Sequence, residues 1–318
     1  MKVTDYFEAA KDKTLITFEV LPPLKGGSMK AIFDTLDPLM EFKPPFVDVT
    51  YHREEYVYRK QATGYYEKTA IRKRPGTVGI CAAIMHRYGV DAVPHLICGG
   101  FSKEETENAL IDLNFLNINN VLALRGDAAK FEDKFIPHVD GHAFALDLIE
   151  QVNGMNNGQY LDPSIQNGEK TDFCIGIAGY PEKHFESPNL ETDIAFLKKK
   201  VDAGASYIVT QMFFDNQHYF NFVKTCRDAG INVPIVPGLK PITKKYQLNS
   251  IPRLFFIDLP SDLVNAMMSA KDDAALKQIG IEWCAAQSKE LKKFGVPCLH
   301  YYTMGDSKTI RSIAEQVV

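Results

Sequence analysis

Short apolar runs alternate with longer segments of helical period along nearly the whole chain of 318 residues. This alternation is typical of a parallel sheet built from βα units, in which each crossover helix brings the chain back to the sheet. The apolar character of the runs is continuous, which indicates strands that are covered on both faces. Eight runs qualify as strands, and they occupy residues 15–21, 46–51, 92–98, 120–124, 174–178, 207–213, 234–239 and 297–302.

Eight strands are the number of a (β/α)8 TIM barrel, and a doubly wound sheet is the alternative that the same pattern allows. The eight units fill the chain from end to end and leave no room for a second domain. We therefore predict an α/β fold with a single (β/α)8 barrel over residues 1–318. In either architecture, ligands bind at the carboxyl ends of the strands and in the loops that follow them.

Three of the intervening segments carry helix start and stop signals. Ser102 and Glu105 have the spacing of a capping box, and an apolar stripe follows them to residue 116. Apolar residues at helical spacing also predict helices over 188–204 and 216–229, with a glycine at or just after each end. The stretch 128–171 contains a tract rich in Gly and Asn and is predicted to be irregular.

The composition is that of an ordinary globular protein, with 45% hydrophobic and 24% charged residues and a formal net charge of -4. This balance excludes a disordered chain, and a slight acidic excess gives no footprint for nucleic acid or an anionic membrane. The sequence shows no targeting or membrane-spanning run, so we expect a cytoplasmic protein with a small-molecule partner. Six single cysteines form no C-x-x-C pair and are interpreted as buried apolar residues.

Glu19 interrupts the otherwise apolar first strand, LITFEVL. Burial of a carboxyl group is costly unless the group is paired or protonated, and loss of solvent raises its pKa toward the range of a general acid. The alternative is a structural glutamate that is paired with an Arg or Lys inside the barrel. The sequence physics leaves both interpretations open.

Other polar side chains follow the ends of other strands. The fourth strand ends in the tripeptide RGD (125–127), where the glycine permits close backbone approach and the two charges can bind a ligand or pair with each other. His95 lies near the third strand, His184 follows the fifth, and Gln211 lies in the sixth. Each has a structural alternative, but their convergence on one barrel mouth favours a small-molecule site.

Motifs for several other chemistries are absent from the sequence. No G-x-G-x-x-G follows a predicted strand, and neither a nucleotide P-loop nor a serine nucleophile elbow occurs. His138 and His142 have a helix-face spacing, but the VDG between them is a turn sequence and no further ligand is near. No metal site is therefore predicted.

Nine short segments, taken in order, make the chain resemble one family. They are FEVLPP (18–23), VTY (49–51), PHL (94–96), LRGD (124–127), AGYPE (178–182), KVDAGA (200–205), TQMFFD (210–215), PG (237–238) and HYYT (300–303). Each segment alone is weak, but the ordered set is specific and covers nearly the whole chain. On these motifs the chain resembles the catalytic module of methylenetetrahydrofolate reductase, a flavin-binding (β/α)8 barrel, without the S-adenosylmethionine-responsive domain of the eukaryotic enzymes.

The resemblance implies that FAD binds at the barrel mouth, is reduced by NADH or NADPH, and is reoxidised by 5,10-methylenetetrahydrofolate to give 5-methyltetrahydrofolate. Because both substrates use one flavin face in this family, the resemblance also implies ping-pong kinetics. The pathway is then one-carbon metabolism and methionine biosynthesis. The expected assembly is a cytoplasmic homo-oligomer with no nucleic-acid or membrane partner.

Carried over residue by residue, the resemblance assigns roles to the strand-end side chains. Glu19 becomes the general acid that protonates the folate and helps to open its five-membered ring, and Asp127 lies near the flavin and the pterin and tunes the cofactor. Asp127, Gln211 and Gln247 are expected to bind folate. The positions that match FAD contacts are Thr50, Tyr51, His95, Arg125, Gly126, Asp127, Ala145, Tyr180, His184, Asp193, Lys199 and Lys200.

The chain departs from the family pattern at several positions. Arg53 stands where small residues are common, Phe196 replaces a polar FAD contact, and Asp306 stands where an Arg often meets the folate tail. Two other functions fit the barrel. One is another flavin-dependent oxidoreductase that resembles proline dehydrogenase in architecture, and the other is a barrel that binds flavin or folate without turnover.

Overall fold

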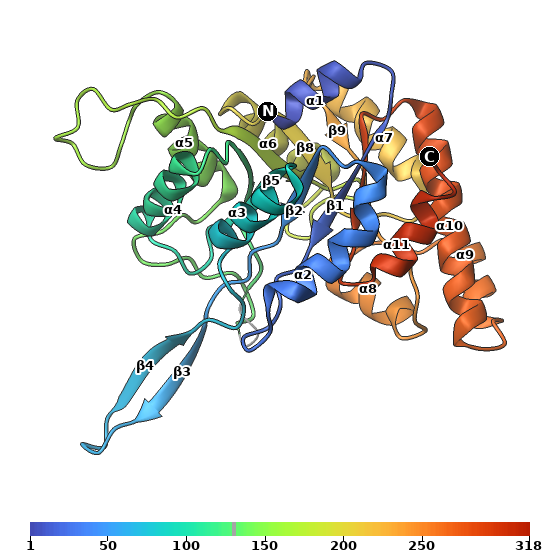
Figure 1. Cartoon of the computed structure of the whole chain (residues 1–318), viewed down its shortest axis with the longest axis horizontal. Coiled ribbons are helices and arrows are strands. Elements are labelled where there is room, and N and C mark those ends of the chain that lie inside the picture. The colour runs from blue at the N-terminus through green and yellow to red at the C-terminus, as the bar shows by residue number, and fades with distance from the viewer. Residues whose placement is uncertain (129–131) are drawn as a thin grey trace.

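Parallel strands form one sheet that curves into a ring in the computed structural model, which describes residues 1–128 and 132–318 (Figure 1). Along the chain these strands are β1 (Leu15–Val20), β2 (Phe46–Val49), β5 (Asp91–Ile97), β6 (Asn120–Leu124), β7 (Cys174–Gly179), β8 (Tyr207–Thr210), β9 (Ile235–Val236), β10 (Gly238–Leu239) and β11 (Cys298–Tyr302). Their order in the sheet is β10-β11-β1-β2-β5-β6-β7-β8-β9. Each of the eight predicted runs overlaps one of these strands or, for 234–239, two of them, so the strand prediction is confirmed.

The two ends of this order are consecutive pieces of one segment, which is interrupted at Pro237. β9 pairs with β8 through Ile235 and Ile208, and β10 pairs with β11 through Gly238 and His300. Pro237 has no N–H to donate, but its carbonyl oxygen accepts a hydrogen bond from the backbone N of His300 at 3.1 Å. This segment therefore lies between β8 and β11 and closes the ring. When β9 and β10 are counted as one strand, the ring has eight strands, which confirms the (β/α)8 barrel.

Helices follow most of the strands and surround the ring. They are α1 (Val3–Ala10), α2 (Met29–Leu36), the 3-10 helix η1 (Asp37–Phe42), α3 (Thr77–Tyr88), α4 (Lys103–Phe115), α5 (Ala145–Asn156), α6 (Leu190–Asp202), α7 (Asn216–Asp228), α8 (Gln247–Phe255), α9 (Ser261–Met268), α10 (Asp273–Phe294) and α11 (Ser307–Ala314). The three predicted helices are confirmed as α4, α6 and α7. The predicted capping box is also formed, because Ser102 Oγ accepts from the backbone N of Glu105 at 3.1 Å.

The segment 128–171, which was predicted to be irregular, contains α5. Leu148, Ile149 and Val152 of this helix are fully buried in the main core. Burial of this apolar stripe outweighs the low helix propensity of the Gly and Asn residues near the end of the helix. The prediction is therefore wrong over α5, and residues 129–131 lie outside the described part of the chain.

Side chains of the strands alternate between the inside of the barrel and the surrounding helical layer. Phe18 of β1 packs in the large cluster formed with the helices, whereas Leu15 packs against a smaller cluster inside the ring. Val3 and Phe7 of α1 belong to the inner cluster, and the backbone N of Val3 donates to Asn120 Oδ1 at 2.8 Å. Helix α1 thus closes the amino-terminal end of the barrel, and the carboxyl ends of the strands face the other way (Figure 1).

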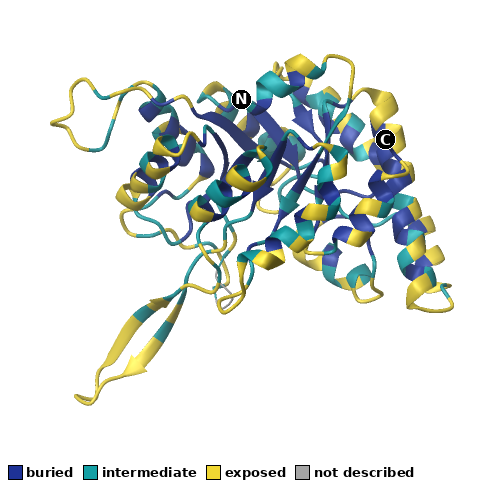
Figure 2. Cartoon of the chain, viewed as in Figure 1, coloured by how far each residue is buried: buried dark blue, intermediate teal, exposed yellow. Residues whose placement is uncertain are grey.

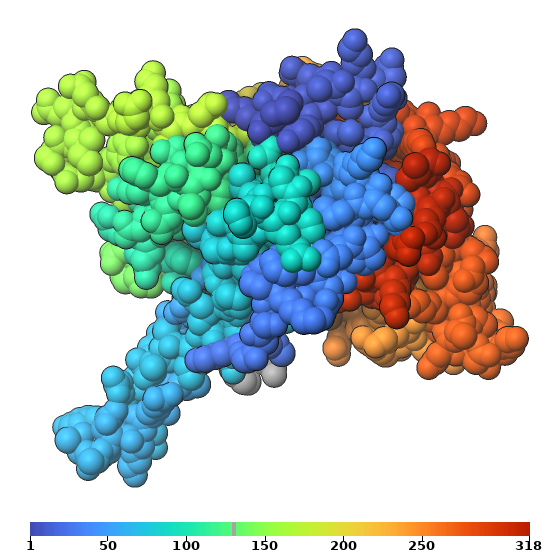
Figure 3. Space-filling view, in the orientation of Figure 1, coloured from blue at the N-terminus to red at the C-terminus, as the bar shows by residue number. Residues whose placement is uncertain are grey.

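A two-stranded antiparallel hairpin, β3 (Glu55–Lys60) and β4 (Tyr66–Ile71), projects from the carboxyl end of the barrel (Figure 3). The hairpin is exposed over most of its length (Figure 2), and Tyr58 and Tyr66 are each 65% exposed. The base is tied to the loop after β1, because the backbone N of Lys25 donates to Lys73 O at 2.7 Å. These strands are not predicted from the sequence, since the hairpin has almost no buried face to produce an apolar pattern.

The six cysteines are all free and buried, which confirms their interpretation as apolar core residues. Burial raises the pKa of Cys98 and of Cys284 to about 12. These thiols therefore stay protonated at neutral pH and lack the thiolate character of a nucleophile.

Candidate active site

Three ionisable side chains meet inside the barrel near the carboxyl ends of their strands. Glu19 on β1 and Asp48 on β2 are direct partners in the parallel register, so their side chains lie on the same face of the sheet. His95 comes from β5, the next strand in the ring, and its Nε2 lies 3.6 Å from Glu19 Oε2 and 3.6 Å from Asp48 Oδ2. The exposed fractions of the Glu19, Asp48 and His95 side chains are 12%, 1% and 6%.

Glu19 has the electrostatic properties of a proton donor. Burial raises its pKa from the ordinary value of 4.5 to about 7; the cations His95 and Lys240 lower it, and the charge of Asp48 raises it further. A carboxyl group that titrates near neutral pH can hold a proton and release it, as a general acid requires. Because burial outweighs the neighbouring cations, the alternative of a purely structural ion pair is disfavoured.

The polar layer continues around the ring to β11. Thr17 Oγ1 lies 2.9 Å from Nδ1 of His300, a residue that is 1% exposed. Several buried polar atoms in this layer have no hydrogen-bond partner among the described residues, and they are both carboxylate oxygens of Asp48, Nε2 of His95, Nε2 of His300 and the hydroxyl of Tyr207. Such atoms are costly to bury, and proteins keep them mainly where function requires them.

Sequence analysis does not single out Asp48, His300 or Lys240. Asp48 lies in the strand FVDV, which has the same signature as the Glu19 strand, one carboxyl group in an apolar run. That signal could have found Asp48. Lys240 follows a strand of two residues and approaches Glu19 only through tertiary packing, for which the sequence carries no signal.

A cationic group forms from residues that follow β6 and β7 and from Lys200 in the last turn of α6. Arg125 Nη1 donates to Glu186 Oε2 at 2.5 Å, and Asp193 Oδ2 accepts from the backbone N of His184 at 3.0 Å. Burial lowers the pKa of Lys200 and that of His184, and the charge of Arg125 lowers both further, so the charges of these residues interact. Arg125, His184, Asp193 and Lys200, all expected from the resemblance to contact FAD, are thus brought together.

This cationic group suits a phosphate-bearing cofactor such as FAD. Burial lowers the pKa of Lys200 and Arg125 lowers it further, whereas the carboxylate of Asp193 offsets these effects only in part. Two neighbouring cations with little access to water are stabilised when an anion binds between them. The donor set therefore fits the diphosphate of the cofactor.

Gly126 and Asp127 complete this edge of the mouth. Gly126 has φ +82°, and a Cβ there would lie 3.2 Å from Ile97 Cβ, so the predicted need for a glycine is met. Asp127 is exposed. The pKa of Tyr180 is raised to about 12, mainly by burial and further by the charge of Asp127. Arg125 forms its ion pair with Glu186, so the alternative of an internal Arg-Asp pair within this tripeptide is not observed among the described contacts.

Four further positions expected to contact FAD lie in the loops and helix starts that follow these strands. The backbone N of Thr50 donates to Val20 O at 3.1 Å, directly after β2. The Tyr51 ring is half-buried, and the Tyr180 ring centroid lies 4.7 Å from that of His184. Ala145 is the first residue of α5 and is buried. These positions are compatible with the predicted contacts, which stay predictions.

The two glutamines expected to bind folate already use their side-chain oxygens within the protein. Gln211 Oε1 accepts from the backbone N of Met212 at 2.9 Å. Gln247 Oε1 accepts from the backbone N of Thr243 at 2.8 Å and of Lys244 at 2.9 Å. A ligand would therefore meet mainly the amide NH2 groups of both side chains, which act as donors.

Lys199 lies apart from the cationic group. It is exposed on α6, and its Nζ lies 5.2 Å from the centroid of the Phe196 ring, which is itself 51% exposed. Lys199 and Phe196 line a shallow surface groove together with other α6 residues. Of the two adjacent lysines, Lys200 is thus the one that the structure brings to Arg125.

Two of the residues that depart from the family pattern are engaged by carboxylate or backbone partners. Arg53 donates to both carboxylate oxygens of Glu132, at 3.0 and 3.2 Å. Asp306 caps α11 by accepting from the backbone N of Thr309 at 3.1 Å, and its Oδ2 lies 3.2 Å from Lys277 Nζ. Asp306 is therefore a structural cap in this chain.

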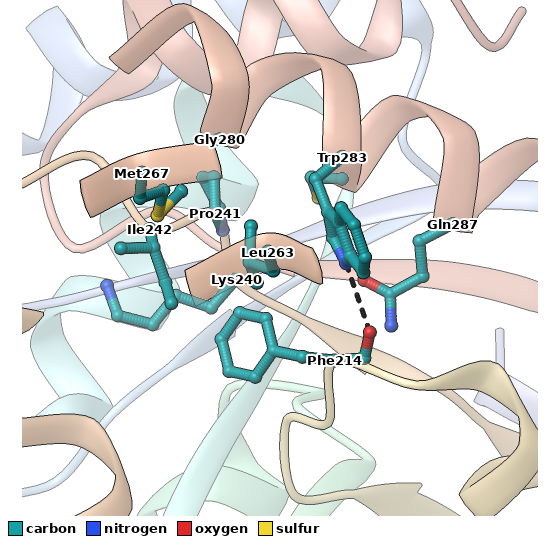
Figure 4. A pocket seen from close by; sticks show the side chains of 10 residues that line it. Phe214, Lys240, Pro241, Ile242, Leu263, Met267, Gly280, Trp283 and Gln287 are labelled. Carbon is teal, nitrogen blue, oxygen red and sulfur yellow. Dashed lines mark hydrogen bonds between the residues drawn. The ribbon is translucent and has the colours of Figure 1, made fainter. Parts of the chain in front are cut away.

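A narrow cavity lies outside the ring, between α9, α10 and the loop after β10 (Figure 4). Leu263, Met267 and Trp283 contribute to its lining, and Trp283 Nε1 donates to Phe214 O at 3.0 Å. The space is mostly apolar and too tight to admit a water molecule. We interpret it as a packing gap between helices rather than a ligand site.

Comparisons with known proteins show which family this chain is similar to. A family model described as methylenetetrahydrofolate reductase matches residues 3–318. The chain is 33% identical over 321 residues to methylenetetrahydrofolate reductase (NADH) 1 of Arabidopsis thaliana, which covers 97% of this chain and 49% of the plant protein. It is 29% identical over 290 residues to 5,10-methylenetetrahydrofolate reductase of Escherichia coli, which covers 91% of this chain and 86% of that protein.

The chain spans about half the length of the plant relatives that it matches. Among solved structures, an uncharacterised protein from Clostridium thermocellum, described as binding two copies of 5-methyl-5,6,7,8-tetrahydrofolic acid, matches with a TM-score of 0.56. That match covers 99% of both chains at 13% sequence identity, and it supports the fold alone. Because the family model matches nearly every residue, the chain belongs to the methylenetetrahydrofolate reductase family.

Proposed function

We propose that this chain reduces 5,10-methylenetetrahydrofolate to 5-methyltetrahydrofolate, with FAD bound at the barrel mouth and NADH or NADPH as the electron donor. The observation that carries the proposal is the buried carboxyl of Glu19, whose pKa is raised to about 7 at the ligand-binding end of a barrel of this family. Relatives are named for NADH in Arabidopsis thaliana and for NADPH in Caenorhabditis elegans, which supports either donor.

The residues of the chain divide the work of this reaction. FAD, when bound, would supply the hydride chemistry that links the two substrates. Arg125, His184 and Lys200 would hold its diphosphate through charge-assisted hydrogen bonds. Glu19 would hold a proton inside the barrel and deliver it to the folate as the five-membered ring opens, so that the folate gains one hydride and one proton.

The folate would be held at the same mouth. Gln211 and Gln247 would donate from their amide groups to the folate, since their side-chain oxygens are already engaged. Asp127 is exposed beside Tyr180 and would lie near both the cofactor and the pterin. A single mouth for both substrates supports ping-pong kinetics, in which the donor leaves before the folate binds.

The remaining expectations concern location and assembly. Over residues 1–128 and 132–318, the chain contains no helix that combines the length and apolarity needed to cross a membrane. A cytoplasmic location, a homo-oligomeric assembly and a place in methionine biosynthesis stay predictions.

The proposal is tested with the purified protein reconstituted with FAD under anaerobic conditions. Addition of NADH or NADPH should bleach the visible flavin absorption, and subsequent addition of methylenetetrahydrofolate should restore it. A protein that cannot take up FAD would contradict the proposal. A flavin that is bleached but not restored by the folate would leave an oxidoreductase with a different second substrate.

A further inference from the structure

The carboxyl of Asp48 is almost fully buried beside Glu19 and His95, and the mechanism above does not use it. We propose that Asp48 is the counter-ion that keeps His95 charged, and that this pair sets the pH at which Glu19 releases its proton. The inference rests on the proposed function, because it assigns a positioning residue to that reaction. Asp48 acts through His95, whereas Glu19 is the group that meets the substrate.

The first support is the burial of Asp48 without other compensation. Its side chain is 1% exposed, and neither carboxylate oxygen has a hydrogen-bond partner among the described residues. Nε2 of His95 lies 3.6 Å from Asp48 Oδ2. A buried carboxylate is costly unless a cation offsets it, so Asp48 and His95 stabilise each other in their charged forms.

The second support is the position of His95 between two carboxyl groups. Its Nε2 is 3.6 Å from both Asp48 and Glu19, and one imidazolium cannot fully offset two carboxylates. Burial lowers the pKa of His95, but its interactions with the carboxylates of Asp48 and Glu19 outweigh burial and raise it. Glu19, the more exposed of the two acids, is left to carry the second proton.

Few other charges around Glu19, Asp48 and His95 act on the pKa of Glu19. The titratable groups whose charges interact with these three residues are Lys240, Tyr302, His300, His52, Cys81, Tyr207 and Cys298. Burial raises the pKa of the thiols and phenols among these groups and lowers that of His300 and His52, so these side chains favour their neutral forms. His95 and Lys240 are therefore the cations that act on Glu19.

The test compares wild type with Asp48→Asn, which keeps the shape of the side chain and removes its charge. The first readout is the NMR titration of the His95 ring in the FAD-reconstituted protein without substrate, with the signal assigned by its loss in His95→Gln. Without Asp48 the ring should titrate about one pH unit or more lower than in wild type. Asp48→Ser provides a second uncharged variant if the asparagine variant folds poorly.

The second readout is the pH profile of flavin reoxidation by methylenetetrahydrofolate. When His95 loses its charge, Glu19 loses the cation beside it, an effect on its pKa that is larger than the opposite effect of losing the Asp48 charge, so Glu19 holds its proton to higher pH. The pH above which reoxidation slows should therefore rise in Asp48→Asn, while the rate at pH 7 falls by no more than about tenfold because Glu19 remains. A purely structural effect would lower the rate equally at every pH.

Glu107→Gln is the matched control, since Glu107 is a buried carboxyl on α4 that accepts from the backbone N of Leu161 at 2.8 Å, away from the barrel mouth. It should leave both the His95 titration and the pH profile unchanged. An unchanged His95 titration in Asp48→Asn would overturn the inference, as would a profile that does not move or moves to lower pH. If folate never reoxidises the wild-type flavin, the proposed function fails, but the NMR result still decides whether Asp48 keeps His95 charged.

Discussion

Replacement of Glu19 by glutamine should stabilise the protein at alkaline pH. Folding raises the pKa of Glu19 from 4.5 to about 7, mainly by burial, so between these pH values the folded chain holds a proton that the unfolded chain has lost. The free energy of unfolding therefore falls as the pH rises through this window and levels off above about pH 7. The full difference corresponds to about 3 kcal/mol. Glutamine has nearly the shape of the protonated acid and does not titrate, so the variant avoids this loss.

Urea unfolding of wild type and Glu19→Gln at pH 5 and pH 8 measures the effect. The variant should exceed wild type in stability by less than about 1 kcal/mol at pH 5 and by up to about 3 kcal/mol at pH 8. The gain is an upper figure, since His95 loses a carboxyl neighbour in the variant. Glu8→Gln, at an exposed position of α1, should show no pH-dependent difference from wild type. A stability difference for Glu19→Gln that is the same at both pH values would refute the assignment of a raised pKa to this carboxyl.

Three further changes test other parts of the structure. Arg125→Gln should weaken FAD binding by about tenfold or more, since a charge-assisted contact to phosphate is lost. Titration of the apoprotein with FAD measures this affinity. Arg59→Gln, on the exposed hairpin, is the control and should leave the affinity unchanged. Gly176→Ala should destabilise the fold by about 1–3 kcal/mol in urea unfolding, because its Cβ would lie 2.3 Å from the buried Tyr207 ring. Gly79→Ala, where a Cβ would meet no atom within 4 Å, serves as its control. Asn120→Ala removes the side-chain bonds to Val3 N and Met1 O, so amide hydrogen exchange in α1 should accelerate.

Much of the barrel could be predicted because its strands and helices are locally encoded. The strand at Phe46–Val49 is an apolar run, and the helix at Lys103–Phe115 begins with a capping box that the structure forms. The helix at Ala145–Asn156 was missed because its stability comes from burial of a stripe in the core, which local composition does not reveal. The exposed hairpin was missed for the opposite reason, since it has almost no buried face to produce an apolar pattern.

Some residues of the site could also be identified from the local sequence, whereas others depend on tertiary packing. Glu19 could be identified because a carboxyl in an apolar strand is a local anomaly, and Gly126 because a strand end needs its backbone freedom. The distance from His95 to Glu19 and Asp48 depends on the order of β1, β2 and β5 around the ring, which no local pattern carries. The separate positions of Lys199 and Lys200 likewise follow from the orientation of α6 and not from their adjacency in the sequence.

The central claim, that Glu19 donates the proton of a flavin-dependent folate reduction, is tested most directly by measuring the two half-reactions of Glu19→Gln separately. Anaerobic stopped-flow absorbance follows flavin reduction by NADH and flavin reoxidation by methylenetetrahydrofolate in the same preparation. We expect reduction by NADH to stay within about twofold of wild type and reoxidation by the folate to slow by about 10²–10⁴-fold. Equal losses in both half-reactions, or reoxidation at the wild-type rate, would contradict the account.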